Sequence, residues 1–196
     1  MRVTQAQWTA AGGWTGLDAI DTGSQLVLVF GAGDALAWPG VLDALRARTP
    51  RAVVAGCSTS GEIAGTRVFD HSIVATAATF ASTRVRTTST PIEGDADSFV
   101  AGHRLASSLQ GPDLTHVLVF SDGLAVNGSQ LAAGLAGTLG ADVQVTGGLA
   151  GDGTAFARTF VIADGNGKEL GRHVGYLKGG PSAFIDKIES LKPKAK

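Results

Sequence analysis

The sequence predicts an α/β protein, a layered sheet-and-helix domain built from two similar halves that each contain a β-strand–α-helix–β-strand unit. Three observations predict this class. Short apolar runs alternate with helix-like segments, glycines follow those runs, and similar short sequences recur about 90 residues apart. The 28 glycines are about twice the usual ~7% share, which indicates sharp turns or close backbone approaches.

The first half begins with an expected buried strand at residues 25–30, an apolar and partly β-branched run. Pro39 suits the first turn of a following helix, because its missing N–H costs nothing there. The inward face of this helix would comprise Val41, Leu42 and Leu45. A second strand is expected at residues 52–55, ended by Gly56. Tight strand–helix–strand connections predict that the two strands are parallel.

Two further strands are expected at residues 72–80 and 82–90. Side chains in the second alternate between apolar or small and basic or polar, so one face would meet water. A helix capped by Asp95 or Asp97 would run to Leu109. Its inward stripe would comprise Phe99, Gly102, Ala106 and Leu109.

The pattern then begins again with a strand at residues 117–120 and a helix capped by Asn127 or Ser129. Leucines at four-residue spacing place one face of that helix inward, namely Leu131, Leu135 and Leu139. A strand at 142–146 would end at Gly147-Gly148. Another strand at 156–163 would turn through Asp164-Gly165-Asn166-Gly167, a strong hairpin signal.

The two halves, about 25–90 and 115–177, align at a nearly constant offset. Leu28-Val29-Phe30 matches Leu118-Val119-Phe120 at an offset of 90, Gly56 matches Gly147 at 91, and Ile73-Val74 matches Val161-Ile162 at 88. This spacing favours a tandem duplication. The alternative is a chance likeness between two strand–helix–strand units.

Composition excludes several classes of function. A formal net charge of −1 argues against electrostatic binding to nucleic acid. The single cysteine allows no intrachain disulfide and favours a reducing compartment. The amino terminus has no apolar stretch typical of a secretory signal, and no apolar run approaches the ~20 residues that span a bilayer. We therefore expect a cytoplasmic protein that contacts neither membrane nor nucleic acid.

Four glycine-rich loops follow the expected parallel strands, where ligands bind in open α/β sheets. Exposed backbone N–H groups there can receive an anion, and a carboxylate can hold an ammonium group. We expect Glu62 or Asp152 to receive the ammonium and the Gly147-Gly148 backbone to face the anion. The alternative is that the loops are only tight turns. The predicted ligand-binding residues are Cys57, Ser58, Thr59, Ser60, Gly61, Glu62, Ser121, Asp122, Asn127, Gly147, Gly148 and Asp152.

Three of these segments, in the same order, resemble the signature of the FIST domain: 54–63 with 70–74, 121–129 and 146–153. The resemblance spans roughly residues 26–179 and implies an amino-terminal FIST region over 1–180. It also implies a signal-transduction sensor that binds small ligands, for example amino acids, and acts on a signalling protein or domain. Members normally continue into a second FIST region. If their ligand pocket lies between the two regions, this chain carries one wall of it.

The last residues, 181–196, form a tail of different composition. All six lysines lie from Lys168 onward, and nine of the ten arginines precede it. A foreign origin would explain this change. The alternative is a native, solvated amphipathic helix over residues 182–191, with Phe184, Ile185, Ile188 and Leu191 as its apolar stripe.

Catalysis finds little support in the sequence, and we expect no enzyme. Cys57 would need a nearby base, and the four histidines are scattered, so a small buried residue in a turn is the simpler interpretation. A hydroxyl nucleophile such as Ser58 or Ser121 likewise has no visible base. Leu36 replaces the third glycine of the dinucleotide fingerprint, and no P-loop lysine occurs. Neither a metal nor another cofactor is predicted, because no ligand spacing is present.

The favoured function from sequence is therefore sensing of a small polar metabolite, for example an amino acid. A protein–protein interaction module without its own ligand, including one that forms a homodimer, is the competing hypothesis.

Overall fold

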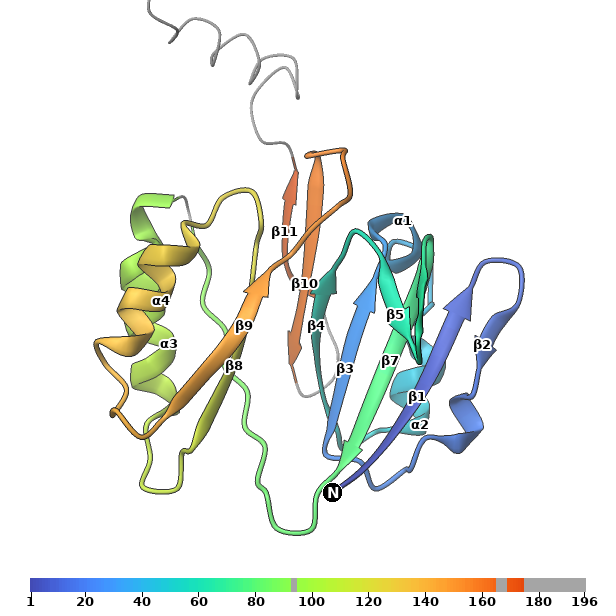
Figure 1. The fold of residues 1–196 in the computed structure, drawn as a ribbon, viewed down its shortest axis with the longest axis horizontal. Helices are drawn as coiled ribbons and strands as arrows, with labels where there is room; N and C mark the ends of the chain where they lie inside the picture. Colours follow the sequence, from blue (N-terminus) through green and yellow to red (C-terminus); the bar gives the residue numbers. More distant parts are fainter. Residues whose placement is uncertain (93–94, 165–168, 175–196) are drawn as a thin grey trace, which may run out of the picture.

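The computed structural model describes residues 1–92, 95–164 and 169–174 of the chain. They form a mixed α/β fold with one seven-stranded sheet, two two-stranded sheets and helices (Figure 1). The predicted α/β class is confirmed. The predicted tail helix at 182–191 lies outside the described residues, as do residues 165–167 of the predicted hairpin. The strands on either side of that turn do pair antiparallel.

The large sheet is mixed, and among the described residues its only parallel neighbours are the two strands that the sequence predicts to be parallel. Its order is β11 (Glu169–Val174), β10 (Arg158–Asp164), β4 (Val53–Ser58), β3 (Leu26–Gly31), β7 (Ser72–Thr79), β1 (Arg2–Thr9) and β2 (Gly13–Thr15). The carboxyl ends of β3 and β4 therefore lie at the same edge of the sheet, where the predicted loops begin.

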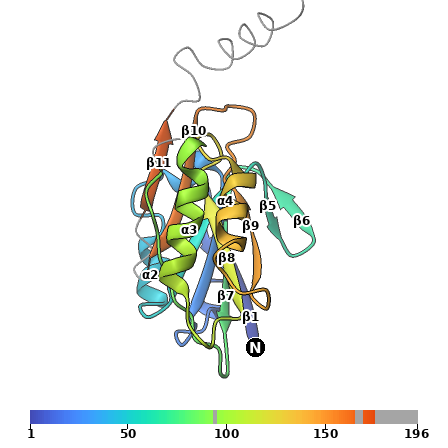
Figure 2. The same cartoon turned by 90° about the vertical axis from the view of Figure 1, so that its left-hand side faces the viewer.

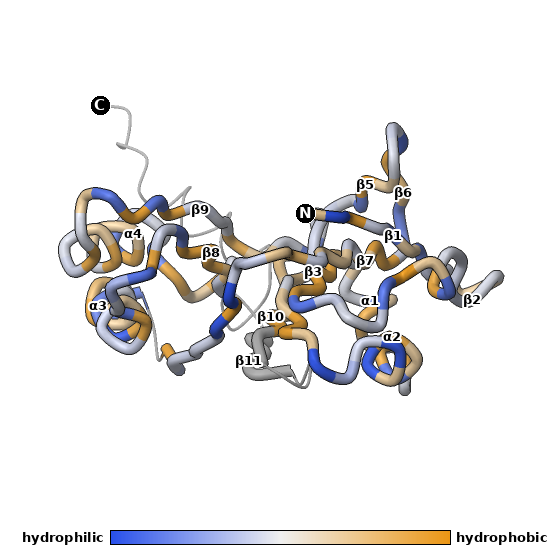
Figure 3. The backbone as a smooth tube through the Cα atoms, turned by 90° about the horizontal axis from the view of Figure 1, so that it is seen from below, coloured by the Kyte–Doolittle hydropathy of each residue, from blue (hydrophilic) through white to orange (hydrophobic). Residues whose placement is uncertain are grey.

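Short helices cover one face of this sheet: η1 (Leu17–Ala19), α1 (Gly33–Leu36) and α2 (Asp43–Arg48). Val27 and Val29 of β3 are fully buried against this layer together with Leu45. The alternate residues of β3, on the opposite face, are only half-buried. Seen from below, α1 and α2 lie on one side of the sheet, and the hairpin of β5 (Glu62–Ala64) and β6 (Arg67–Phe69) lies on the other (Figure 3).

A second unit contains η2 (Asp95–Asp97), α3 (Ser98–Leu109), β8 (His116–Ser121), α4 (Gly128–Ala136) and β9 (Gln144–Leu149). The two helices pack against each other beside the parallel pair β8–β9 (Figure 2). The three leucines predicted to face inward are buried, and the side chain of Asn127 caps α4 by accepting from the backbone N–H of Gln130 at 3.1 Å. Asp97 takes the N-cap position of α3 without a side-chain hydrogen bond, and Phe99 is 47% exposed instead of facing inward.

Two glycines expected to end strands lie inside them instead. Gly56 has φ +156° within β4, and Gly147 has φ +149° within β9. An added Cβ atom would lie 1.8 Å from the carbonyl oxygen of Val29 at the first position and 1.9 Å from that of Val119 at the second. The glycines are therefore sites of close strand approach, and each strand continues beyond its glycine.

The strand predicted at residues 82–90 is wrong, because this segment forms no regular secondary structure. Its side chains bond to the end of α3 and to the loop that follows it. Arg84 pairs with Asp113, Arg86 donates to the carbonyl oxygen of Leu109 at 2.8 Å, and Thr88 shares a hydrogen bond with Ser108. These contacts replace the backbone ladder that the alternating pattern predicts.

The structure does not show a duplication of whole halves. The pairs β3–β4 and β8–β9 are both parallel, and each has its glycine opposite a valine of the neighbouring strand. The aligned outer strands differ, however, because β7 pairs with β3, whereas β10 pairs with β4 of the first half. A tandem duplication stays a prediction.

Candidate functional site

The predicted loops meet at one edge of the molecule, above the carboxyl ends of β3, β4, β8 and β9 (Figure 1). The backbone N–H of Gly151 donates to the carbonyl oxygen of Ser58 at 2.8 Å. The N–H of Gly153 donates to Oγ of Ser60 at 3.0 Å. The segments that contain Cys57 and Asp152 therefore lie side by side, although they are about 95 residues apart in the sequence.

Glu62 is enclosed and fully engaged. Its side chain is 1% exposed and accepts from Oγ1 of Thr59 at 2.8 Å, from Oγ of Ser72 at 2.9 Å and from the N–H of Ser72 at 3.3 Å. A buried carboxyl group needs such partners to offset its lost hydration. Through its hydrogen bonds to Ser72, Glu62 links β5 to β7.

The two predicted aspartates also stabilise loops. Asp152 accepts from the backbone N–H groups of Phe156, Ala157 and Arg158 at 2.6–3.1 Å. Asp122 accepts from the N–H groups of Leu124 and Ala125 and from Oγ1 of Thr159, at 2.6–2.7 Å. Ser58, fully buried, accepts from the N–H of Phe160 at 3.0 Å. Such Asx and serine contacts fix turn geometry.

Ser121 differs from the other predicted polar residues. Its Oγ atom is buried and has no hydrogen-bond partner among the described residues. A buried hydroxyl without a partner is uncommon, and each case needs an explanation such as a bound water or ligand. Gly147 and Gly148 lie in the exposed strand β9, where Gly148 is the register partner of Phe120, the residue before Ser121.

Ser121 and Asp122 line a cleft of about 1380 Å³ between the large sheet and the second unit. Its floor includes Leu26, Val53 and Ala55 on the half-buried side of the sheet, together with Val161 of β10. Its far wall is α3, and its rim is the segment at 82–92, which is rich in hydroxyl groups and arginine. The cleft therefore combines an apolar floor with a polar rim, as small-molecule sites commonly do.

One edge of β8 faces this cleft, since all seven residues from 116 to 122 line it. The carbonyl oxygens of Thr115 and Ser121 accept from β9, so every second residue of β8 points towards β9. The N–H and C=O groups of Leu118 and Phe120 point the other way. They have no partner within the part of the chain that the structure describes. The cleft thus offers both donors and acceptors beside the Ser121 hydroxyl.

The three clustered segments lie within the range that matches a known family. The FIST N domain family matches residues 25–187, which is most of the sequence. The chain belongs to the FIST N domain family. FIST domains are generally sensory domains in signal transduction. No curated protein and no solved structure matches the chain at a significant level.

An ion pair at the same edge of this FIST domain was not among the predicted site residues. Nδ1 of His71 lies 2.6 Å from Oδ2 of Asp34, and both side chains are exposed. The hydrogen bond and charge of Asp34 raise the pKa of His71. Partial burial raises the pKa of Asp34, but the hydrogen bonds from His71 and Ala35 outweigh it and lower that pKa below its ordinary value. His71 belongs to the segment 70–74 named above, and Asp34 directly follows the glycine-containing turn at residues 31–33 after the first strand.

We expect Asp34→Asn to lower the pKa of His71 towards its ordinary value of 6.5, because the partner's charge is lost. The stabilisation from His71 is complete below its unfolded pKa and is lost as pH rises through its raised folded pKa. The stabilisation from Asp34 is present above its unfolded pKa of 3.8 and is lost as pH falls through its lowered folded pKa. The pair therefore contributes most between about pH 4 and 6.5. NMR titration of the imidazole checks this, and an unchanged His71 pKa in the variant would contradict it.

Cys57 has the environment of a structural thiol. It is 4% exposed in β4, and burial raises its pKa to about 11. About 10⁻⁴ of the thiol would be ionised at pH 7, and only the thiolate is strongly nucleophilic. We expect the folded FIST domain to react with an aromatic disulfide reagent far more slowly than the same chain in denaturant. Equal rates in the two states would show that the thiol is accessible.

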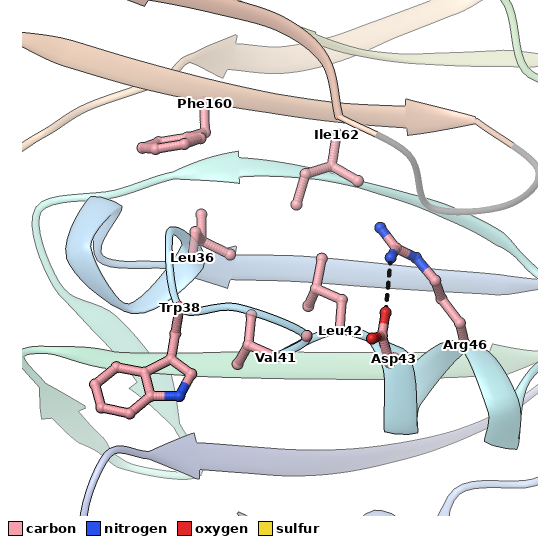
Figure 4. A pocket seen from close by; sticks show the side chains of 9 residues that line it. Leu36, Trp38, Val41, Leu42, Asp43, Arg46, Phe160 and Ile162 are labelled. Carbon is pink, nitrogen blue, oxygen red and sulfur yellow. Dashed lines mark hydrogen bonds and ion pairs between the residues drawn. The ribbon is translucent and has the colours of Figure 1, made fainter.

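A second, smaller cavity lies on the helix-covered side of the large sheet (Figure 4). Its volume is about 180 Å³, below the ~300 Å³ of typical small-molecule sites. Leu36 faces Phe160 and Leu42 faces Ile162 of β10 across it, and the pair Asp43–Arg46 lies at one end. None of the predicted site residues lines it. Among the residues described here, no cluster of three or more His, Cys, Asp or Glu could hold a metal ion, and no helix could cross a membrane.

Proposed function

We propose that this FIST domain senses a small metabolite with a polar head, for example an amino acid, that binds in the large cleft beside β8. The observation that carries the proposal is the buried, unpartnered Oγ of Ser121 at the wall of that cleft. The carboxylates of Glu62, Asp122 and Asp152 frame the site, since each is already hydrogen-bonded within the chain. Ligand binding would then be reported to a signalling protein or domain.

The free edge of β8 supports the choice of a zwitterionic ligand. Backbone N–H groups such as that of Leu118 suit a carboxylate, and the neighbouring carbonyl oxygens suit an ammonium group. The apolar floor can take an aliphatic side chain. Because about 1380 Å³ exceeds the ~300–1,000 Å³ of typical sites, such a ligand would occupy part of the cleft beside water.

A thermal-shift panel of amino acids and related metabolites tests the proposal. A ligand at 100 times its Kd stabilises the folded state by ~2.7 kcal/mol, which raises Tm measurably. Ser121→Ala should weaken binding about tenfold, as expected for one lost hydrogen bond. Ser129→Ala is the matched control, because Ser129 is exposed and does not line the cleft. A blank panel with folded protein, or equal losses in both variants, would refute the proposal.

The competing function, an interaction module without a ligand, is favoured by a different observation. The face of the large sheet opposite α1 and α2 is half-exposed and includes Leu26, Leu28 and Phe30. In that case Ser121→Ala and every metabolite would leave Tm unchanged, while a signalling partner would raise it.

A further inference from the structure

In the described part of the chain, no strand pairs with the outer edge of β9. All six residues of the strand, Gln144–Leu149, are exposed, and β9 pairs only with β8 among the described residues. The strand carries no charge and no proline, and its pairing with β8 runs without a register shift. Protein sheets usually protect such an edge with lysine, proline or a bulge. An unprotected edge is therefore a surface suited to strand addition.

The backbone groups available for this addition can be identified. The N–H groups of Gln144 and Ala150 donate to Thr115 and Ser121 of the β8 side. Alternate residues of a strand point in opposite directions within the sheet, so Val145, Gly147 and Leu149 turn their N–H and C=O groups outward. In the described part of the chain, these six groups find no hydrogen-bond partner.

We propose that this edge binds a second copy of the same chain, forming a two-fold homodimer in which β9 pairs antiparallel with β9. The favoured register places Gly147 opposite Gly147 of the other copy. Val145 then lies opposite Leu149 on each side of the axis, and every outward-facing residue enters a hydrogen-bonded pair. A shift of two residues in either direction would leave one outward residue of each copy unpaired.

Side chains and charge favour a second copy over an unrelated strand. Val145 is 36% exposed and Leu149 is 48% exposed, and the favoured register brings these two apolar side chains together across the axis. Directly opposed residues on one face have Cβ atoms ~4.5–5.5 Å apart, which permits contact. An uncharged strand does not repel its own copy, and a net charge of −1 leaves little long-range repulsion between copies.

The interface predicts a reversible dimer. Two six-residue strands bury less area than the ~1,600 Å² of a standard stable interface. Association should therefore depend on protein concentration over the micromolar range. The inference is independent of the metabolite proposed above, because β9 does not line the cleft.

Sedimentation velocity on the whole chain and two double variants tests both the partner and the register. Val145→Lys/Leu149→Lys opposes lysines across the axis and should give a monomer. Val145→Lys/Leu149→Glu opposes lysine and glutamate across the same axis and should restore the dimer, because opposite charges then face each other. Both variants change the same exposed positions, so each is the other's control for folding, checked by circular dichroism.

The outcomes separate clearly. A dimer that the two-lysine variant abolishes and the lysine–glutamate variant restores, with slowed amide exchange at Gly147, supports the proposal. A parent chain that stays monomeric at high micromolar concentration would overturn it, as would a dimer that both variants leave intact. Loss of the dimer in both variants would overturn the register that the proposal states.

Discussion

Gly56→Ala is expected to destabilise the domain by about 3 kcal/mol or more. The new Cβ atom would lie 1.8 Å from the carbonyl oxygen of Val29 and 2.7 Å from its carbon, both in the backbone of the parallel neighbour β3. Backbone in a central strand cannot move aside as a side chain can. The φ of +156° adds strain, because residues with a side chain rarely adopt it. Chemical denaturation of the purified variant measures the loss.

Gly148→Ala provides the control for this prediction. Gly148 also lies in a strand and follows a closely approached glycine, but nothing lies within 4 Å of an added Cβ atom. Its exposed position in β9 should tolerate alanine with a change within about 0.5 kcal/mol. If Gly56→Ala unfolds at the same denaturant concentration as Gly148→Ala, the close approach of β3 and β4 is not as tight as the structure has it.

The strands that sequence predicts well are those with continuous apolar runs. Residues 25–30 and 117–120 are found as β3 and β8 within one or two residues, because a short uninterrupted apolar run followed by turn residues is a strong local signal for a strand. The strands β1 and β2, by contrast, were not predicted. In β1, Ala6 and Trp8 are buried while neighbouring residues are polar, a pattern short enough to be missed.

The segment at 82–90 shows the limit of periodicity as a guide. It has the β-branched, alternating composition of a strand, yet no partner strand receives it in the part of the chain described. Side-chain bonds from Arg84 to the loop after α3 and from Arg86 to the end of α3 hold this segment against that helix. Pairing depends on tertiary context, which local pattern does not contain.

The candidate site was predictable in place but not in detail. The rule that ligands bind beyond the carboxyl ends of parallel strands selected loops that do lie side by side, as the contact between Gly151 and Ser58 shows. Sequence did not reveal which polar atoms are already bonded. Glu62 and Asp152 have the same residue types as ligand-binding carboxylates, but the structure surrounds each with three internal donors. Only the hydrogen-bond geometry of the structure distinguishes Glu62 and Asp152 from Ser121, whose Oγ has no partner among the described residues.

The contact between α3 and α4 gives the second large expected effect. Gly134→Ala should destabilise the domain by about 2 kcal/mol, although alanine raises intrinsic helix propensity by ~1 kcal/mol over glycine. An added Cβ atom would lie 2.1 Å from the carbonyl oxygen of Phe99 and 3.0 Å from the N–H nitrogen of His103 in the facing helix. Gly102 makes the reciprocal contact, 2.3 Å from the carbonyl oxygen of Leu131. The two helices contact each other at Gly102 and Gly134, so a Cβ atom at either position can be accommodated only if the helices move apart.

Gly140→Ala supplies the comparison, because nothing lies within 4 Å of a Cβ atom there. We expect thermal unfolding to place Gly134→Ala well below the parent chain and Gly140→Ala close to it. The double variant Gly102→Ala/Gly134→Ala should be less destabilised than the sum of its single variants, since one separation of the helices relieves both clashes. Strict additivity would mean that the two glycines do not share one contact, and a stabilised Gly134→Ala variant would show that helix propensity outweighs packing at this crossing.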